Sequence, residues 1–185
     1  MIRLGGGTAP DGWPGGADIH QVNRWEKALR RLERVATVTV GMATAECGTA
    51  ALEVLLALDY RIATGDFRLT AAPDDRLPWP GMAMHRLVNQ IGLSRTRQVL
   101  LVGAAVPAER ALAYGLVDEI VDDADDAIRR AVRAFATVPG AELAVRRQLL
   151  LEAAASSFED ALGTHLAACD RELRRRRGRT AGDTA

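Results

Sequence analysis

The chain has 185 residues, enough for one domain with a substantial core. Hydrophobic residues make up 48% and charged residues 26%, which is an ordinary composition for a globular protein. Lys and Arg total 24, and Asp and Glu also total 24, so no excess charge attracts nucleic acid or an anionic membrane. We expect neither as a partner.

Compartment is indicated by the cysteines and by the N-terminal residues. Cys47 and Cys169 form no disulfide framework, which suits a reducing compartment. The N-terminus lacks the basic and apolar blocks of a signal peptide, and no apolar stretch reaches membrane-spanning length. We therefore expect a cytoplasmic protein.

In its first half the chain predicts alternating strands and helices. Asp18 is a plausible N-cap, and the β-branched residues of 35–42 favour a buried strand. The elements expected are a strand over 1–4, a helix over 18–34, a strand over 35–42, a turn at 47–49 that opens a second helix, and strands over 60–63 and 67–70.

In the second half helices dominate. The elements expected after a loop over 73–81 are helices over 82–91, 94–102 and 108–114, a strand over 117–121, and helices over 125–137 and 141–177, the last broken around 156–157. Gly115 is expected to end its helix as a C-cap. Strands separated by helices indicate an α/β fold with a parallel sheet.

Glu53 stands alone in an uncharged run over 48–58. Because desolvating a carboxylate is costly, an acid kept in such a segment is expected to have a raised pKa, as a general acid or base at neutral pH requires. The alternative is an acid at the edge of a helix, paired with Arg61 or another cation. The run by itself favours neither interpretation.

Four segments resemble the enoyl-CoA hydratase/isomerase (crotonase) superfamily, and together they cover most of the chain. They are GGADI at 15–19; AALE at 50–53 with DYRIA at 59–63; WPG at 79–81 with HRL at 85–87 and IG at 91–92; and LVG at 101–103 with AERA at 108–111 and YGLV at 114–117. The resemblance implies a crotonase-like β-β-α spiral core over 1–122, a helical region over 123–177 and a disordered tail over 178–185. Only residues 1–4 precede the first segment as a strand, so the family's N-terminal unit is expected to be truncated.

A narrower resemblance points to the hydratase-like accessory proteins of dihydroxyphenylglycine biosynthesis. It rests on residues 18–26, 146–152, 157–162 and 165–170. It implies a CoA-thioester dehydratase/isomerase of antibiotic biosynthesis, which helps a type III polyketide synthase by dehydrating and aromatising its product to 3,5-dihydroxyphenylacetyl-CoA. The substrate would be an acyl-CoA, with no separate cofactor. The expected partners are further copies of the chain, as a trimer or hexamer, and a paralogous hydratase or the synthase.

The superfamily resemblance also implies site residues. The backbone N–H groups of Gly15 and Ala50 would hold the enolate oxygen, although the family usually has glycine at the second position. Glu53 would be the first proton-transferring carboxylate and Asp74 the second, with Asp75 in reserve because the loop is one residue short. Elimination of water needs a base at Cα and an acid at the leaving oxygen. The alternatives are a turn role for Gly15 and a solvated turn for the two aspartates.

Other candidate residues are expected to be structural. His20 and His85 lie on predicted helices, where a lone histidine is more often structural than catalytic. His165 and Cys169 share a helix face, but without a third ligand they do not make a metal site, and no metal is expected. Trp79, between two prolines, is expected to plug its loop.

Two other functions stay open. One is a non-catalytic hydratase-like scaffold that supports an active paralogue or the synthase. The other is a general enoyl-CoA hydratase/isomerase of acyl-CoA catabolism. Replacing Glu53 with glutamine separates catalyst from scaffold, because only a catalyst loses activity without losing its fold.

Overall fold

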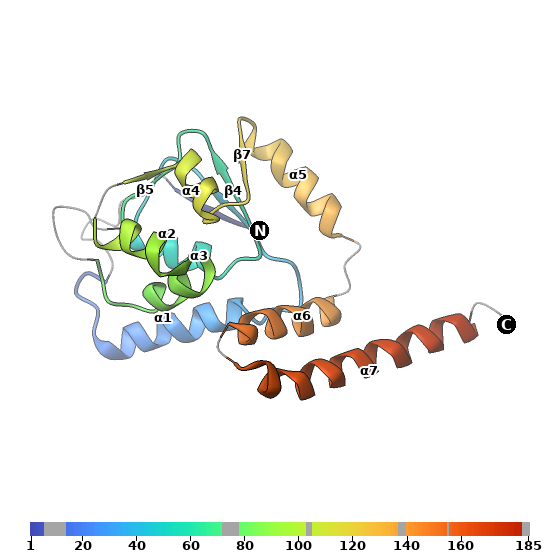
Figure 1. The fold of residues 1–185 in the computed structure, drawn as a ribbon. Helices are drawn as coiled ribbons and strands as arrows, with labels where there is room; N and C mark the ends of the chain where they lie inside the picture. The colour runs from blue at the N-terminus through green and yellow to red at the C-terminus, as the bar shows by residue number, and fades with distance from the viewer. Residues whose placement is uncertain (6–13, 72–77, 103–104, 137–139, 155, 183–185) are drawn as a thin grey trace.

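The computed structural model describes residues 1–5, 14–71, 78–102, 105–136, 140–154 and 156–182 (Figure 1). In chain order the elements are β1 (Ile2–Leu4), α1 (Ile19–Leu32), β2 (Val40–Ala43), β3 (Glu46–Cys47), α2 (Thr49–Leu56), β4 (Tyr60–Thr64), β5 (Arg68–Leu69), α3 (Ala83–Leu100), β6 (Val106–Pro107), α4 (Ala108–Tyr114), β7 (Glu119–Val121), α5 (Ala124–Phe135), α6 (Gly140–Ala153) and α7 (Phe158–Gly182).

The main sheet has four strands in the order β1-β2-β4-β7, and every neighbouring pair is parallel. In the register of the two central strands, Met42 lies opposite Ile62. The parallel sheet predicted from the sequence is therefore confirmed. A parallel sheet needs cover on both faces, which the helices provide.

A second, smaller sheet joins β3, β5 and β6, with β3 parallel and β6 antiparallel to β5. The chain passes from β2 through β3 into α2, and from β4 through β5 towards α3, so a strand-strand-helix unit repeats. Ala45, at φ 51°, forms the corner between β2 and β3. The sequence predicted neither β3 nor β6, because a two-residue strand depends on its distant partner rather than on its own pattern.

Strand β2 begins later than predicted, at Val40 rather than at residue 35. The carbonyls of Val35 and Thr37 accept hydrogen bonds from Arg147. The N–H of Thr39 donates to the Asp59 carboxylate. These backbone groups are thus committed to side chains instead of a neighbouring strand.

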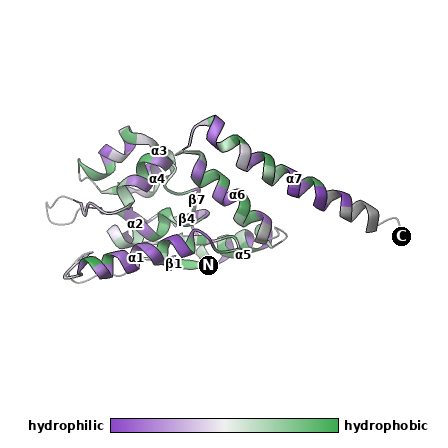
Figure 2. Ribbon diagram, turned by 90° about the horizontal axis from the view of Figure 1, so that it is seen from below, coloured by the Kyte–Doolittle hydropathy of each residue, from purple (hydrophilic) through white to green (hydrophobic). Residues whose placement is uncertain are grey.

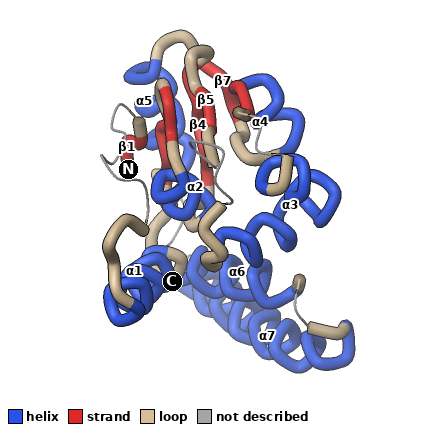
Figure 3. The backbone as a smooth tube through the Cα atoms, turned by 90° about the vertical axis from the view of Figure 1, so that its left-hand side faces the viewer, coloured by secondary structure: helices blue, strands red, loops and turns tan. Residues whose placement is uncertain are grey.

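Two hydrophobic clusters lie on the two faces of the main sheet (Figure 3). One gathers around α2, α3 and α4. The other packs α5 against the sheet through Val40, Met42, Ile62, Ala127 and Ala131. Because the sheet is covered on both faces, every residue of β2 is buried.

The helix ends follow the chemistry expected from the sequence. Asp18 caps α1 and forms a reciprocal capping box with Gln21. Gly115 ends α4 in the left-handed conformation at φ 77°, as a C-cap glycine does. The helices predicted over 82–91 and 94–102 are joined in α3, which is kinked at Gly92 by its φ of 81°.

The C-terminal helices α6 and α7 are separated at the predicted break around 156–157. Helix α7 extends away from the rest of the molecule, with hydrophilic and hydrophobic residues alternating along it (Figure 2). It continues to Gly182, so the tail expected to be disordered from residue 178 is helical to that point. The arginine run before it favours helix, because arginine is a good helix former. Among the helices described, none is long and apolar enough to cross a membrane.

Candidate active site

Glu53 lies in the second turn of α2 and is only 2% exposed. Its neighbours Leu52, Leu55 and Leu56 are equally buried, because α2 packs into the core on nearly all sides. Of the two interpretations left open by the sequence, the structure shows the buried acid. The guanidinium of Arg61 donates instead to Gln90 and to the carbonyls of residues 56 and 58.

The partner of the Glu53 carboxyl is Trp25 of α1. The indole Nε1–H of Trp25 donates to Glu53 Oε2 at 2.5 Å. The two residues are 28 positions apart, and the contact fixes the middle of α1 against α2. Because α1 starts directly after residues 14–18, the same helix is continuous with the segment that contains Gly15.

The other carboxyl oxygen of Glu53 lies against Gly81. A Cβ at Gly81 would come within 2.7 Å of Glu53 Oε1 and within 2.6 Å of the ring of Trp79. Only glycine therefore fits at position 81, between the Glu53 carboxyl and the ring of Trp79. Trp79 is half-buried over this position, consistent with the predicted plugging of its loop.

Burial raises the pKa of the Glu53 carboxyl above its ordinary value. The Trp25 N–H, the positive charge of Arg86 and the backbone N–H of Ala83 all favour the charged form, but they do not cancel the effect of burial. The negative charge of Glu26 adds to the rise. The carboxyl is thus shifted towards the neutral pH range in which a general acid or base operates.

Arg86 is itself largely neutralised by two acids of α1. Its guanidinium donates to both carboxyl oxygens of Glu26, at 2.6 and 3.0 Å, and to Glu33 at 2.7 Å. Burial opposes its charge, but these bonds raise the pKa of Arg86, which keeps the guanidinium fully protonated. The pair of acids ties α3 to α1 and leaves only a weak attraction of Arg86 for Glu53.

Ala50 lies in the first turn of α2, whose N-terminus has no side-chain cap. Gly48 at the N-cap has no side chain to offer, and the Thr49 hydroxyl donates instead to the Ala71 carbonyl at 3.0 Å. The N–H groups of a first helical turn have no partner within the helix and carry the positive end of the helix dipole. Ala50 therefore occupies a place where a backbone N–H can bind a developing negative charge.

Gly15 lies in an exposed turn, closed by a hydrogen bond from the Ala17 N–H to the Pro14 carbonyl at 3.1 Å. Its φ is 55°, a left-handed conformation that favours glycine. The turn role expected as the alternative for Gly15 is thus present in the structure. Asp74 and Asp75 lie outside the described residues.

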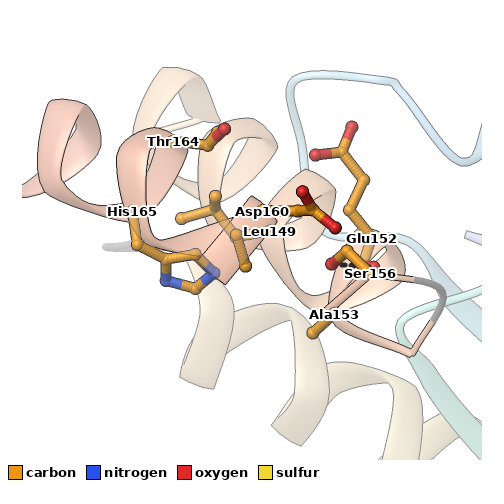
Figure 4. Close-up of a pocket in the computed structure, with 8 residues that line it drawn as sticks. Leu149, Glu152, Ala153, Ser156, Asp160, Thr164 and His165 are labelled. Atoms are coloured by element: carbon orange, nitrogen blue, oxygen red, sulfur yellow. Dashed lines mark hydrogen bonds between the residues drawn. The ribbon is translucent and has the colours of Figure 1, made fainter. Parts of the chain in front are cut away.

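Two cavities are found elsewhere in the described part of the chain. One, of about 280 Å³, lies between α6 and α7 and is lined by Glu152, Asp160 and His165 among others (Figure 4). The second, of about 320 Å³, lies where α6 meets the end of α2 and is lined by residues that include Arg61 and Asp118. Neither lining includes Glu53, and within the described ranges no group of three metal-binding side chains occurs.

Trp25 and Gly81 are the site residues that sequence reasoning missed. Trp25 entered the sequence analysis only within the segment 18–26 of the narrower resemblance, and Gly81 only within the segment 79–81. The sequence did hold an indication for Trp25, because a tryptophan packed inside a protein usually needs an acceptor for its N–H. Which acceptor it finds depends on how α1 packs, and this is not visible in the local sequence.

Comparison with known proteins gives consistent results. A family model described as enoyl-CoA hydratase/isomerase matches residues 16–175. The chain is 44% identical over 169 residues to a protein of Amycolatopsis orientalis named "Enoyl-CoA-hydratase", covering 91% of this chain and 78% of the relative.

Solved structures show the same fold. An enoyl-CoA hydratase from Thermoplasma volcanium superposes with a TM-score of 0.75 at 18% identity, over 94% of this chain and 73% of that one. An enoyl-CoA hydratase/isomerase from Marinobacter aquaeolei gives 0.74 at 14% identity, over 84% of this chain. The match spans only 60% of the Marinobacter chain. These likenesses confirm the predicted crotonase-like fold.

Proposed function

The chain belongs to the enoyl-CoA hydratase/isomerase family, and from this membership we propose that it acts as a dehydratase/isomerase on CoA thioesters. The observation that carries the proposal is the Glu53 carboxyl. It is 2% exposed, its pKa is raised by burial, and it lies one turn from the uncapped N-terminus of α2. A proton-transferring group beside a site for negative charge is what enolate chemistry requires.

Each residue would have a distinct role in the elimination of water. Glu53 removes a proton from Cα of a 3-hydroxyacyl thioester, and the electron pair moves to the thioester oxygen. The N–H groups of Ala50 and Gly15 hold that oxyanion, each stabilising the transition state by about 3 kcal/mol. The carbonyl then re-forms, the 3-hydroxyl leaves, and Asp74 protonates it to water. The substrate carries its own CoA, so no further cofactor takes part.

The substrate we propose is the product of a type III polyketide synthase, converted to 3,5-dihydroxyphenylacetyl-CoA. The resemblance of residues 18–26 and of the C-terminal segments supports this choice. Water loss that completes an aromatic ring is thermodynamically favourable, which makes the reaction run towards the aromatic product. Further copies of the chain, a paralogous hydratase or the synthase are the partners that this role would involve.

A second candidate function is a non-catalytic partner of hydratase fold, or scaffold. The burial of Glu53 also favours this function, because both carboxyl oxygens already have protein neighbours. Trp25 donates to one oxygen, and Gly81 lies against the other. In a scaffold, replacing Glu53 by glutamine removes a buried acid at no functional cost.

One experiment separates the candidates. Wild type, Glu53→Gln and Glu109→Gln are each added to a type III synthase with malonyl-CoA, and release of 3,5-dihydroxyphenylacetyl-CoA is followed by chromatography. Glu109, exposed on α4, is the matched control. We expect Glu53→Gln alone to lose the stimulation, by about 10²- to 10⁴-fold. Equal stimulation by all three proteins would establish the scaffold.

A parallel assay with crotonyl-CoA tests for a general hydratase of acyl-CoA catabolism. Turnover of crotonyl-CoA by wild type, with no effect on the synthase product, would replace the proposed substrate but keep the proposed chemistry. Turnover of neither substrate would contradict both catalytic roles.

A further inference from the structure

The hydrogen bond between Trp25 and Glu53 has no part in the chemistry proposed above. It joins two helices through the one acid of α2, at 2.5 Å, and it is made by a side chain that does not itself titrate. An indole N–H can only donate, so Trp25 cannot serve as an acid or base. Its effect on the reaction must act through Glu53.

The bond makes the two oxygens of Glu53 different. Because the indole only donates, Oε2 has to remain an acceptor whether the carboxyl is charged or neutral. A proton on the neutral carboxyl is therefore favoured on Oε1. That oxygen lies against Gly81, with the ring of Trp79 close by.

Trp25 is held in place by the residue that follows it. Glu26 receives two hydrogen bonds from Arg86, which is 7% exposed, and Glu33, the C-cap of α1 about two turns further on, receives a third. This ties α1 to α3 on both sides of Leu29, itself buried. These bonds fix the backbone of α1 next to Trp25 relative to α3.

We propose that Trp25 is a positioning residue, which orients the Glu53 carboxyl and directs the transferred proton to Oε1. This inference rests on the proposed catalytic function, and it adds a residue of α1 to the machinery.

The first test uses the unaltered chain and does not depend on activity. With glutamate labelled by carbon-13 at the side-chain carboxyl, Glu53 is identified as the resonance lost in Glu53→Gln, and it is titrated by NMR. The Trp25 indole N–H resonance, identified by its loss in Trp25→Phe, is followed over the same pH range. We expect both to shift with one midpoint. An indole resonance that does not move as Glu53 titrates would overturn the proposal.

The second test compares variants of α1. Trp25→Phe removes a donor that favours the charged carboxylate, so we expect the pKa of Glu53 to rise further. Trp25→Gln keeps an N–H donor, so the pKa of Glu53 in this variant is expected to lie between its values in wild type and in Trp25→Phe. Leu29→Ala, buried on the same helix, is the control for loose packing and is expected to leave the Glu53 titration as in wild type. A Leu29→Ala shift as large as that of Trp25→Phe would show a merely structural role.

The activity readout distinguishes this inference from the proposed function. We expect Trp25→Phe to lower kcat by about 10- to 100-fold with little change in KM, and to move the acidic limb of the pH profile to higher pH. If Glu53→Gln loses activity but Trp25→Phe has the pH–activity profile of wild type, the inference about Trp25 is refuted and the proposed function stands. If the wild-type protein is inactive but the Glu53 and Trp25 resonances still shift with one midpoint, the proposed function is refuted and the linkage between Trp25 and Glu53 stands.

Discussion

Arg147 of α6, which is buried, and Asp59, just before β4, form a partly buried ion pair between residues 88 positions apart. The Arg147 Nε donates to Asp59 Oδ1 at 2.6 Å, and the Nη groups donate to the carbonyls of Glu33, Val35 and Thr37. Arg147 is 7% exposed. One side chain thus fastens the C-terminal helices to the connection between α1 and β2.

Replacing Arg147 by methionine is expected to lower the free energy of unfolding by about 3 kcal/mol. The change removes the cation paired with the Asp59 carboxylate, which keeps its hydrogen bonds from Thr39, and it leaves the carbonyls of Glu33, Val35 and Thr37 without the arginine donor. Urea denaturation measures the loss. Arg146→Met is the control, because Arg146 is exposed and makes only a surface pair with Glu142, so about 0.5 kcal/mol or less is expected. Equal midpoints for the two variants would contradict the anchoring role.

Glu53→Gln is expected to change how stability depends on pH. The pKa of Glu53 is raised in the folded state, so between its ordinary value of 4.5 and its folded value the native state binds more protons than the unfolded state. The free energy of unfolding contributed by Glu53 therefore falls as pH rises through this window. The variant has no such group and should show a flatter profile.

Urea midpoints of wild type and Glu53→Gln, measured from about pH 4 to pH 8, check this prediction. The urea midpoint of Glu53→Gln should rise relative to that of wild type as pH rises. A constant difference across the range would mean that the Glu53 carboxyl titrates alike in the folded and unfolded chain.

Gly81→Ala is expected to destabilise the protein by about 1–3 kcal/mol and to reduce activity, because its methyl group would displace Trp79 or Glu53. Gly163→Ala on α7 is the matched control. Nothing lies within 4 Å of a Cβ there, and alanine is the better helix former, so a gain of about 0.5–1 kcal/mol is expected. Thermal unfolding of the two variants should move in opposite directions. A Gly81→Ala variant as stable as wild type would contradict the close approach.

The two cysteines are expected to react at very different rates with an alkylating reagent. Cys169 is exposed, whereas Cys47 is buried and burial raises its pKa to about 11. Because the thiolate is the reactive form, Cys47 should remain unmodified in the native protein and react only after denaturation. Peptide mass spectrometry after brief iodoacetamide treatment checks this. Rapid native labelling of Cys47 would show that β3 opens readily.

Features with a local physical cause were predictable. The Asp18 cap, the Gly115 C-cap and the break before α7 each follow from the chemistry of a few adjacent residues. The packing of the uncharged run around Glu53 in a core was predictable for the same reason, whereas the position of the acid itself was left open between the core and the helix edge. The α/β class followed from the order of the strands and helices.

Other features depend on residues brought together from distant parts of the chain. Strands β3 and β6 exist only because β5 pairs with them, and β2 starts at Val40 because Arg147 and Asp59 bind the backbone ahead of it.

From its own residues, the uncharged run around Glu53 predicted a segment that packs in a core, but it left open whether the acid is buried or lies at the helix edge with Arg61. The packing of α1 against α2 resolves this, because it buries the carboxyl and places the indole of Trp25 against it. Burial of the run is set by the apolar residues next to Glu53, whereas a hydrogen bond requires a donor within about 3 Å, and only the packing of α1 against α2 brings one there.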